Sequence, residues 1–388
     1  MNKLILSALF IPIVCIAQNP KIKDFKIAIL STMLFDTYIG EWGFSAIIEA
    51  DGKRILFDTG SREKTVLENA RELKINLENI DNVFLSHNHK DHTGGLKTLR
   101  ENYPTSFSIA HIGKGIFYPR TNSRGIDHYI LDNKNKLELL GVNFKTHINS
   151  SEVMPGLWPT GQIPRKYDEK NWSELSNMID SNGNKVEDII PEDQSLFFDT
   201  HNGIVLISGC GHAGIINTLD FVSKIIPNRP IYKIIGGFHL LKLNMDKLQW
   251  TAKEMEKFGV KYFVGAHCTG LNSTYSIRDF MNLSSKNALV GSVETYITKV
   301  GIFPGYMEWL HLVQLTKESK LIYFFPKAHC ITASFLKADG SDIANSIRLE
   351  RRSGLILFGN VVVLTKELED SDFIAQGDHN FILNQMNT

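Results

Sequence analysis

The sequence predicts an α/β protein built in layers, followed by a small β-rich C-terminal extension. Three observations support this prediction. Runs of β-type residues alternate with segments of helical spacing, glycine-rich stretches follow several of these runs, and only strand-like runs remain after Gly305. The chain has 388 residues, of which 43% are hydrophobic and 10% aromatic, so it can bury one large core or two smaller ones.

Residues 1–17 have the pattern of a secretory signal peptide. Lys3 precedes an apolar run, 4–16, that is shorter than the roughly 20 residues needed to cross a bilayer. A cut after Ala17 would release the mature chain. We therefore expect export to the periplasm or secretion, with a retained anchor or a lipoprotein processed at Cys15 as the alternatives.

The first part of the predicted domain alternates strands with helices. Asp51-Gly52, between two β-type runs, is a hairpin signal. Strands are expected over 26–31, 44–49, 54–57 and 82–86, and helices over 63–73 and from about residue 95.

Residues from about 113 to 193 show weak periodicity, and we interpret them as a loop-rich insertion over the active face. Beyond them, strands are expected over 194–199, 203–208, 232–235 and 261–264, and helices over 215–226 and 245–258. We assign 18–305 to one domain and 306–388 to the extension. Strands there are expected over 310–315, 320–325, 330–336 and 354–366, with a turn at Gly359-Asn360. The extension carries no chemical motif, which favours a role in packing or in partner binding.

The charge balance excludes some classes of partner. Lys plus Arg and Asp plus Glu number 42 each, so no excess of positive charge indicates nucleic acid or an anionic membrane surface. After the N-terminal run, no apolar stretch is long enough to span a bilayer. We expect a soluble mature chain whose partner is a small-molecule substrate, and the sequence leaves its oligomeric state open.

The strongest chemical signal is the segment SHNHKDHTGG at 86–95, directly after the apolar run 83–85. It places His87, His89, Asp91 and His92 within six residues at a strand end. Imidazole and carboxylate are good ligands for zinc or iron, and such a loop can direct two side chains to one ion and two to another. The alternative is a histidine-rich turn without an ion.

Further histidines follow later strands. His212 lies in GCGHAG, His239 in GGFHL and His267 in AHCTG. Glycines beside each histidine allow the backbone to approach an ion closely. The sequence thus supplies the additional ligands that a two-metal site needs.

This order of motifs, from Asp58 in LFDTG to His267, resembles the metallo-β-lactamase superfamily. The resemblance implies an αββα four-layer sandwich with two divalent metal ions at one edge, zinc first and manganese or iron as alternatives. It also implies that Asp58 holds the ligand loop by hydrogen bonds. The ligands it implies are His87, His89 and His212 for one ion and Asp91, His92 and His267 for the other.

The chain departs from this pattern at the fourth motif, where most members have a carboxylate that bridges the ions. The corresponding strand end offers His239 and no nearby Asp. His239 could ligate an ion, contact substrate as a catalytic residue, or only form hydrogen bonds. Without the bridge, occupancy by a single ion is an alternative.

Several short motifs resemble a narrower group, the subfamily that includes 7,8-dihydropterin-6-methyl-4-(β-D-ribofuranosyl)aminobenzene-5′-phosphate synthase. The motifs are LFDTG at 56–60, TGQIPR at 160–165, GCGHAG at 209–214, GGFHL at 236–240 and HCTG at 267–270. Fold and metal set do not fix the substrate, so the reaction does not transfer with the resemblance.

The expected reaction is hydrolysis of a small ester, phosphodiester, lactone or amide by a metal-activated water. Asp91 could also accept a proton. Arg165, with Thr160, is the candidate contact for an anionic or polar substrate group, although a solvated loop arginine is the competing interpretation. A synthase-like transferase and a non-catalytic metal- or ligand-binding protein are the functional alternatives.

Removal of the signal would leave three cysteines, so at most one disulfide can form within the chain. Cys210 and Cys268 each lie beside a candidate ligand. They could ligate metal, form a disulfide or fill space.

Overall fold

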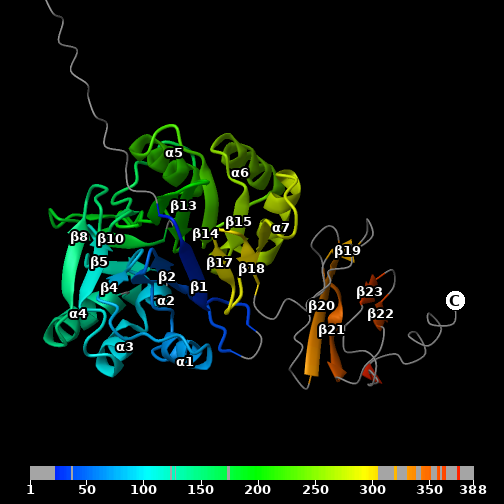
Figure 1. Ribbon diagram of the computed structural model, residues 1–388, viewed down its shortest axis with the longest axis horizontal. Helices are drawn as coiled ribbons and strands as arrows, with labels where there is room; N and C mark the ends of the chain where they lie inside the picture. Colours follow the sequence, from blue (N-terminus) through cyan, green and yellow to red (C-terminus); the bar gives the residue numbers. More distant parts are fainter. Residues whose placement is uncertain are drawn as a thin grey trace, which may run out of the picture.

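The computed structural model describes residues 22–304, except 36, 37, 123, 124, 127, 173 and 174, together with six short strands beyond residue 304 (Figure 1). The predicted signal segment 1–17, the predicted strand 310–315 and the turn Gly359-Asn360 lie outside the described residues. Export therefore stays a prediction. Among the described residues, no helix combines the length and apolar character required to cross a membrane.

The first main sheet has eight strands in the order β18-β17-β1-β2-β3-β4-β5-β8. The turn between β2 and β3 confirms the predicted hairpin, because Asp51 and Gly52 both have positive φ, as a two-residue hairpin turn of type I′ requires. The strands are β1 (Phe25–Ser31), β2 (Ser45–Ala50), β3 (Lys53–Phe57), β4 (Asn82–Phe84), β5 (Ile109–Gly113), β8 (Asn143–His147), β17 (Tyr296–Thr298) and β18 (Ile302–Phe303).

The second main sheet has six strands in the order β16-β15-β14-β13-β12-β9. Its parallel part, β13 to β16, is connected by the helices α5 (Ile215–Ile225), α6 (Met245–Lys257) and α7 (Leu271–Phe280). The strands are β9 (Leu157–Pro159), β12 (Leu196–Thr200), β13 (Gly203–Ser208), β14 (Ile231–Gly236), β15 (Tyr262–Gly265) and β16 (Ala288–Val290).

Three apolar clusters hold four layers together. One lies between the sheets, where Ile27 and Phe57 of the first sheet belong to the same cluster as Phe198 and Val264 of the second. A second cluster joins the second sheet to α5, α6 and α7, and a third joins the first sheet to α1 (Thr65–Glu72), α3 (Leu96–Asn102) and α4 (Tyr129–Leu139). Figure 1 shows these helices on the two outer sides of the paired sheets. The predicted αββα sandwich is confirmed.

The segment 113–193 contains more regular structure than the predicted loop-rich insertion. It supplies α4 to the outer layer and β8 and β9 to the two main sheets. It also forms a small sheet from β6 (Arg120–Asn122), β7 (Gly125–Ile126), β10 (Asn177–Ile179) and β11 (Lys185–Glu187). Strands of two or three residues are too short to show alternation in sequence, which explains the difference.

The described part of the extension consists of strands, as predicted, although β21 and β24 were not expected. One sheet joins β19 (Ser319–Lys320), β20 (Cys330–Lys337), β21 (Asp342–Glu350) and β24 (Ile374–Ala375), and another pairs β22 (Ile356–Phe358) with β23 (Val361–Val363). Its role and its boundary with the domain stay predictions.

Parallel register places the motif loops at one edge. Ser208 of β13 pairs with Gly236 of β14, which pairs with Gly265 of β15, so the loops after these strands leave the sheet side by side. In the other sheet, Phe57 pairs with Phe84, so the loop with Asp58 lies beside the ligand loop after β4.

Candidate metal centre

The loops at this edge bring the ligand-type side chains together. The loop after β4 carries His87 and His89 and continues into the single-turn helix α2 (Lys90–Thr93), which carries Asp91 and His92. The loop with His212 packs directly on it: a Cβ at Gly209 would lie 2.1 Å from Ser86 Oγ. Only glycine fits there, and the close approach joins the two sheets at the site.

The first group consists of His87, His89 and His212, the triad predicted for one ion. His87 Nε2 lies 3.0 Å from His89 Nδ1 and 3.3 Å from His212 Nε2. The ligand atoms of all three lie within 4.8 Å of one another. The rings of His87 and His212 are buried.

Hydrogen bonds at the opposite ring nitrogens orient this triad. Ser86 Oγ lies 2.9 Å from His87 Nδ1 and donates to Asp58, so it accepts the Nδ1 proton of His87. His212 Nδ1 donates to the Asn171 carbonyl at 2.6 Å. Both residues therefore direct an Nε2 lone pair at the same point. Two lone pairs 3.3 Å apart repel each other unless a proton or a cation lies between them.

The second group consists of Asp91, His92 and His267, the triad predicted for the other ion. Asp91 Oδ2 lies 3.8 Å from His92 Nε2 and 3.2 Å from His267 Nε2. His267 is 1% exposed, yet its Nδ1 has no hydrogen-bond partner among the described residues. The Trp42 ring, 48% exposed, meets the His267 ring edge to face at 4.8 Å, at the solvent side.

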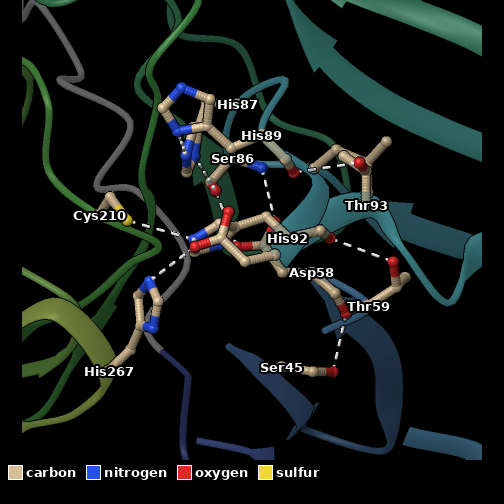
Figure 2. Close-up of polar contacts among 12 residues, drawn as sticks. Ser45, Asp58, Thr59, Ser86, His87, His89, His92, Thr93, Cys210 and His267 are labelled. Carbon is tan, nitrogen blue, oxygen red and sulfur yellow. Dashed lines mark hydrogen bonds and ion pairs between the residues drawn. The ribbon is translucent and has the colours of Figure 1, made fainter. Parts of the chain in front are cut away.

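Asp58 connects the two groups. Its carboxylate accepts hydrogen bonds from Ser86 N, Ser86 Oγ and His92 Nδ1, each at 2.7 Å (Figure 2). The residue has φ +51°, a strained conformation that this network holds in place. The predicted position of Asp58 behind the ligand loop agrees with these contacts.

The electrostatics suit cation binding. Burial lowers the pKa values of His87 and His212 well below the ordinary range, with help from the neighbouring imidazoles, so both rings are neutral. Burial opposes ionisation of Asp91, but His92 and His267 outweigh it and hold the pKa of Asp91 below its usual value. Burial also lowers the pKa of His92, but Asp91 and Asp58 outweigh it and raise the pKa to about 9, which a cation at Nε2 would reverse.

This donor set fits divalent metal ions. Neutral imidazoles and an ionised carboxylate are ligands for zinc, and the Nε2 atoms of the buried His87 and His212 face each other at 3.3 Å. His87, His89 and His212 could hold one ion and Asp91, His92 and His267 another.

His239 lies next to these groups but not within either triad. Its ring centre is 4.6 Å from that of His212, its φ is +52° and its Nδ1 is buried without a hydrogen-bond partner among the described residues. Its ring nitrogen also lies within 4.8 Å of the sulfur atoms of Cys210 and Cys268. Both cysteines are free thiols in the structure.

Arg165 and Thr160 have different contacts from those predicted. The Arg165 guanidinium donates to the carbonyls of His212, Ile189 and Ile190 and stacks over Trp172. Thr160 is fully buried, and its hydroxyl joins β9 to the start of β12. Three backbone carbonyls accept hydrogen bonds from the Nη atoms of Arg165, so the partly buried side chain is not a freely solvated loop arginine, and Thr160 faces the interior. A substrate contact by either residue stays a prediction.

Sequence reasoning missed the residues that orient the ligands. Ser86 is not itself a ligand type, and Asn171 acts through its backbone carbonyl. A backbone contact leaves no signature in residue type. The serine had a local signal, its place between the end of a strand and the first ligand.

Comparison with known proteins agrees with this geometry. The profile of the Metallo-beta-lactamase superfamily matches residues 43–124. The chain is 33% identical over 245 residues to 7,8-dihydropterin-6-methyl-4-(beta-D-ribofuranosyl)-aminobenzene-5′-phosphate synthase of Methanocaldococcus jannaschii, which covers 60% of this chain and 82% of that protein. The chain therefore belongs to the metallo-β-lactamase superfamily.

Two further relatives extend the comparison. An uncharacterized protein of the same organism is 32% identical over 257 residues, covering 64% of this chain and 91% of its own length. The crystal structure of Tm1679, described as a metal-dependent hydrolase of the beta-lactamase superfamily, superposes with a TM-score of 0.59 at 26% identity, covering 70% of this chain and 98% of that one. These comparisons confirm the predicted resemblance to the synthase group. Proteins with this fold generally bind divalent metal ions, and the fold supports the classification of the chain as an enzyme.

Proposed function

We propose that this chain is a metal-dependent hydrolase that acts on a small ester, phosphodiester, lactone or amide. The observation that carries the proposal is the convergence of two adjacent ligand triads, drawn from both sheets, at one edge of the sandwich. Two divalent ions held there would supply Lewis acidity and an activated water.

The chain's own residues would perform the remaining tasks. Asp58 fixes the tautomer of His92 and, through Ser86, that of His87, so the ligand lone pairs are oriented before an ion binds. The Asp91 carboxylate is ionised and partly exposed, and the oxygen that does not face the ligand histidines could accept a proton during turnover. His239 Nδ1 has no hydrogen-bond partner among the described residues and could hydrogen-bond a substrate oxygen.

A direct test uses zinc-loaded protein and a panel of these four substrate classes. We expect turnover of one class, abolished in His87→Ala and retained in His201→Ala, a matched change at an exposed histidine far from the motifs. If no substrate in the panel is turned over, or if His87→Ala is as active as the wild type, the proposal that this chain is a hydrolase is wrong.

The relative from Methanocaldococcus jannaschii favours a second candidate, a synthase-like transferase. The test supplies a dihydropterin and the aminobenzene ribotide to the metal-loaded chain and searches for the coupled product by mass spectrometry. Coupling without hydrolysis of the panel would establish the transferase in place of the hydrolase. Metal binding without either reaction would indicate the non-catalytic alternative.

A further inference from the structure

A buried cysteine lies between the two triads. Cys210 Sγ is 3.2 Å from His92 Nε2 (Figure 2). The sulfur also lies within 4.8 Å of a ring nitrogen of His87, together with the His92 nitrogen. His87 belongs to the first triad and His92 to the second, so the Cys210 sulfur faces both.

The geometry around this sulfur differs from simple packing. Free buried cysteines commonly act as small apolar side chains. Here, however, His92 Nδ1 is bound to Asp58, and its Nε2, the atom that would ligate an ion, faces the sulfur. His267 of the second triad is also buried, and its Nδ1 has no hydrogen-bond partner among the described residues, so this centre contains a polar atom that the described contacts do not satisfy.

A second cysteine supports the position of the first. Cys268 Sγ is 3.4 Å from Cys210 Sγ and accepts the backbone N–H of His239 at 3.3 Å. When Cys210 binds a metal ion as a thiolate, the Cys268 S–H can donate a hydrogen bond to its sulfur.

We propose that Cys210 is a metal ligand, which supplies a thiolate at the junction of the two triads. The inference rests on the proposed metal centre. Metal binding would displace the thiol proton to solvent and form a metal–sulfur bond. Because thiolate is a soft ligand, the centre should prefer zinc, cadmium or cobalt to magnesium and manganese.

Cobalt(II) titration of the full chain tests the proposal. Tetrahedral cobalt shows visible d–d bands with any ligand set, whereas a thiolate ligand adds a charge-transfer band in the near ultraviolet. We expect both signals in the wild type, in Cys268→Ser and in the matched control Cys330→Ser. Cys210→Ser should keep the d–d bands and lose the charge-transfer band.

Each other outcome is decisive. If the wild type shows visible d–d bands but no charge-transfer band, Cys210 is not a ligand, although the proposed metal centre is still supported. If the wild type takes up no cobalt, both the cysteine ligand and the metal centre are wrong. A charge-transfer band lost in Cys268→Ser and kept in Cys210→Ser would assign the sulfur to the wrong residue. If Cys210→Ser fails to fold by circular dichroism, the ¹¹³Cd resonance of wild-type protein decides, since thiolate ligation moves it far downfield of nitrogen and oxygen ligation.

Discussion

At the residue scale, the orientation of the ligands depends on side chains that would not touch an ion. Asp58 accepts three hydrogen bonds at 2.7 Å, two from Ser86 and one from His92. Through these bonds it orients a histidine ring in each triad. Arg165 binds the carbonyl of His212 and thereby the loop that carries this ligand. These contacts can be separated from the ligands by mutation.

Asp58→Asn should weaken metal binding by about 10- to 100-fold, since the amide keeps the shape of the carboxylate but loses its charge and one acceptor. Competition with a chromogenic chelator measures the zinc affinity. The matched control is Asp246→Asn, which removes an exposed carboxylate on α6 and should leave the affinity unchanged. Unaltered affinity in Asp58→Asn would show that the network is dispensable.

Arg165→Ala should lower the free energy of unfolding by about 1–3 kcal/mol, because it leaves partly buried carbonyls without donors. Urea unfolding of the metal-free protein measures the change. Once a substrate is known, the structural role predicts a loss of stability with little change in KM. A large rise in KM at unchanged stability would instead support the substrate contact that the sequence predicts for Arg165.

At the scale of elements, the sequence predicted the strands and helices whose patterns are long and regular, from β1 to β4 and from β12 to β15. It also predicted the six ligand candidates, because motifs at strand ends meet when the strands are parallel. The sequence did not predict α4, because the apolar residues of this helix form only a weak face. It also did not predict β8, because this edge strand is largely exposed and lacks a clear apolar pattern. The partners of Arg165 were hidden because they are backbone atoms of distant loops.

The pairing of β5 with β8 contains a buried histidine pair that predicts acid sensitivity. His111 Nδ1 lies 2.9 Å from His147 Nε2, and His111 Nε2 lies 2.8 Å from Asn82 Oδ1. Burial, with His147 and Lys145 nearby, lowers the pKa of His111 to about 3, and burial also lowers that of His147. A lowered pKa in the folded state means that the stabilisation is complete above the unfolded value near 6.5 and is lost as the pH falls toward 3.

His111→Gln should therefore reduce the acid dependence of the free energy of unfolding by up to about 1.4 kcal/mol per pH unit below pH 6.5. Urea unfolding of metal-free protein at a series of pH values measures this slope against the wild type. His201→Gln, at an exposed position, should leave the slope unchanged. Identical slopes for wild type and His111→Gln would exclude the pair as an acid-labile element.

At the scale of the whole molecule, the packing of the two sheets brings ligands from both of them together in one site. The cluster between the sheets contains Phe57 and Phe84, just before Asp58 and the ligand loop, and Ile207 and Val264, just before the loops of His212 and His267. The rigidity of this core fixes the distance between ligands that are 180 residues apart in the chain, from His87 to His267. A site built in this way forms only when both sheets are folded and packed.

The metal content of the folded chain tests this account most directly. After loading with zinc and removal of free metal, elemental analysis should find two equivalents per chain, and His212→Ala with His267→Ala, one ligand removed from each triad, should retain less than one while the protein stays folded. Zinc-free wild-type protein, or unchanged zinc content in the double variant, would contradict the two converging triads.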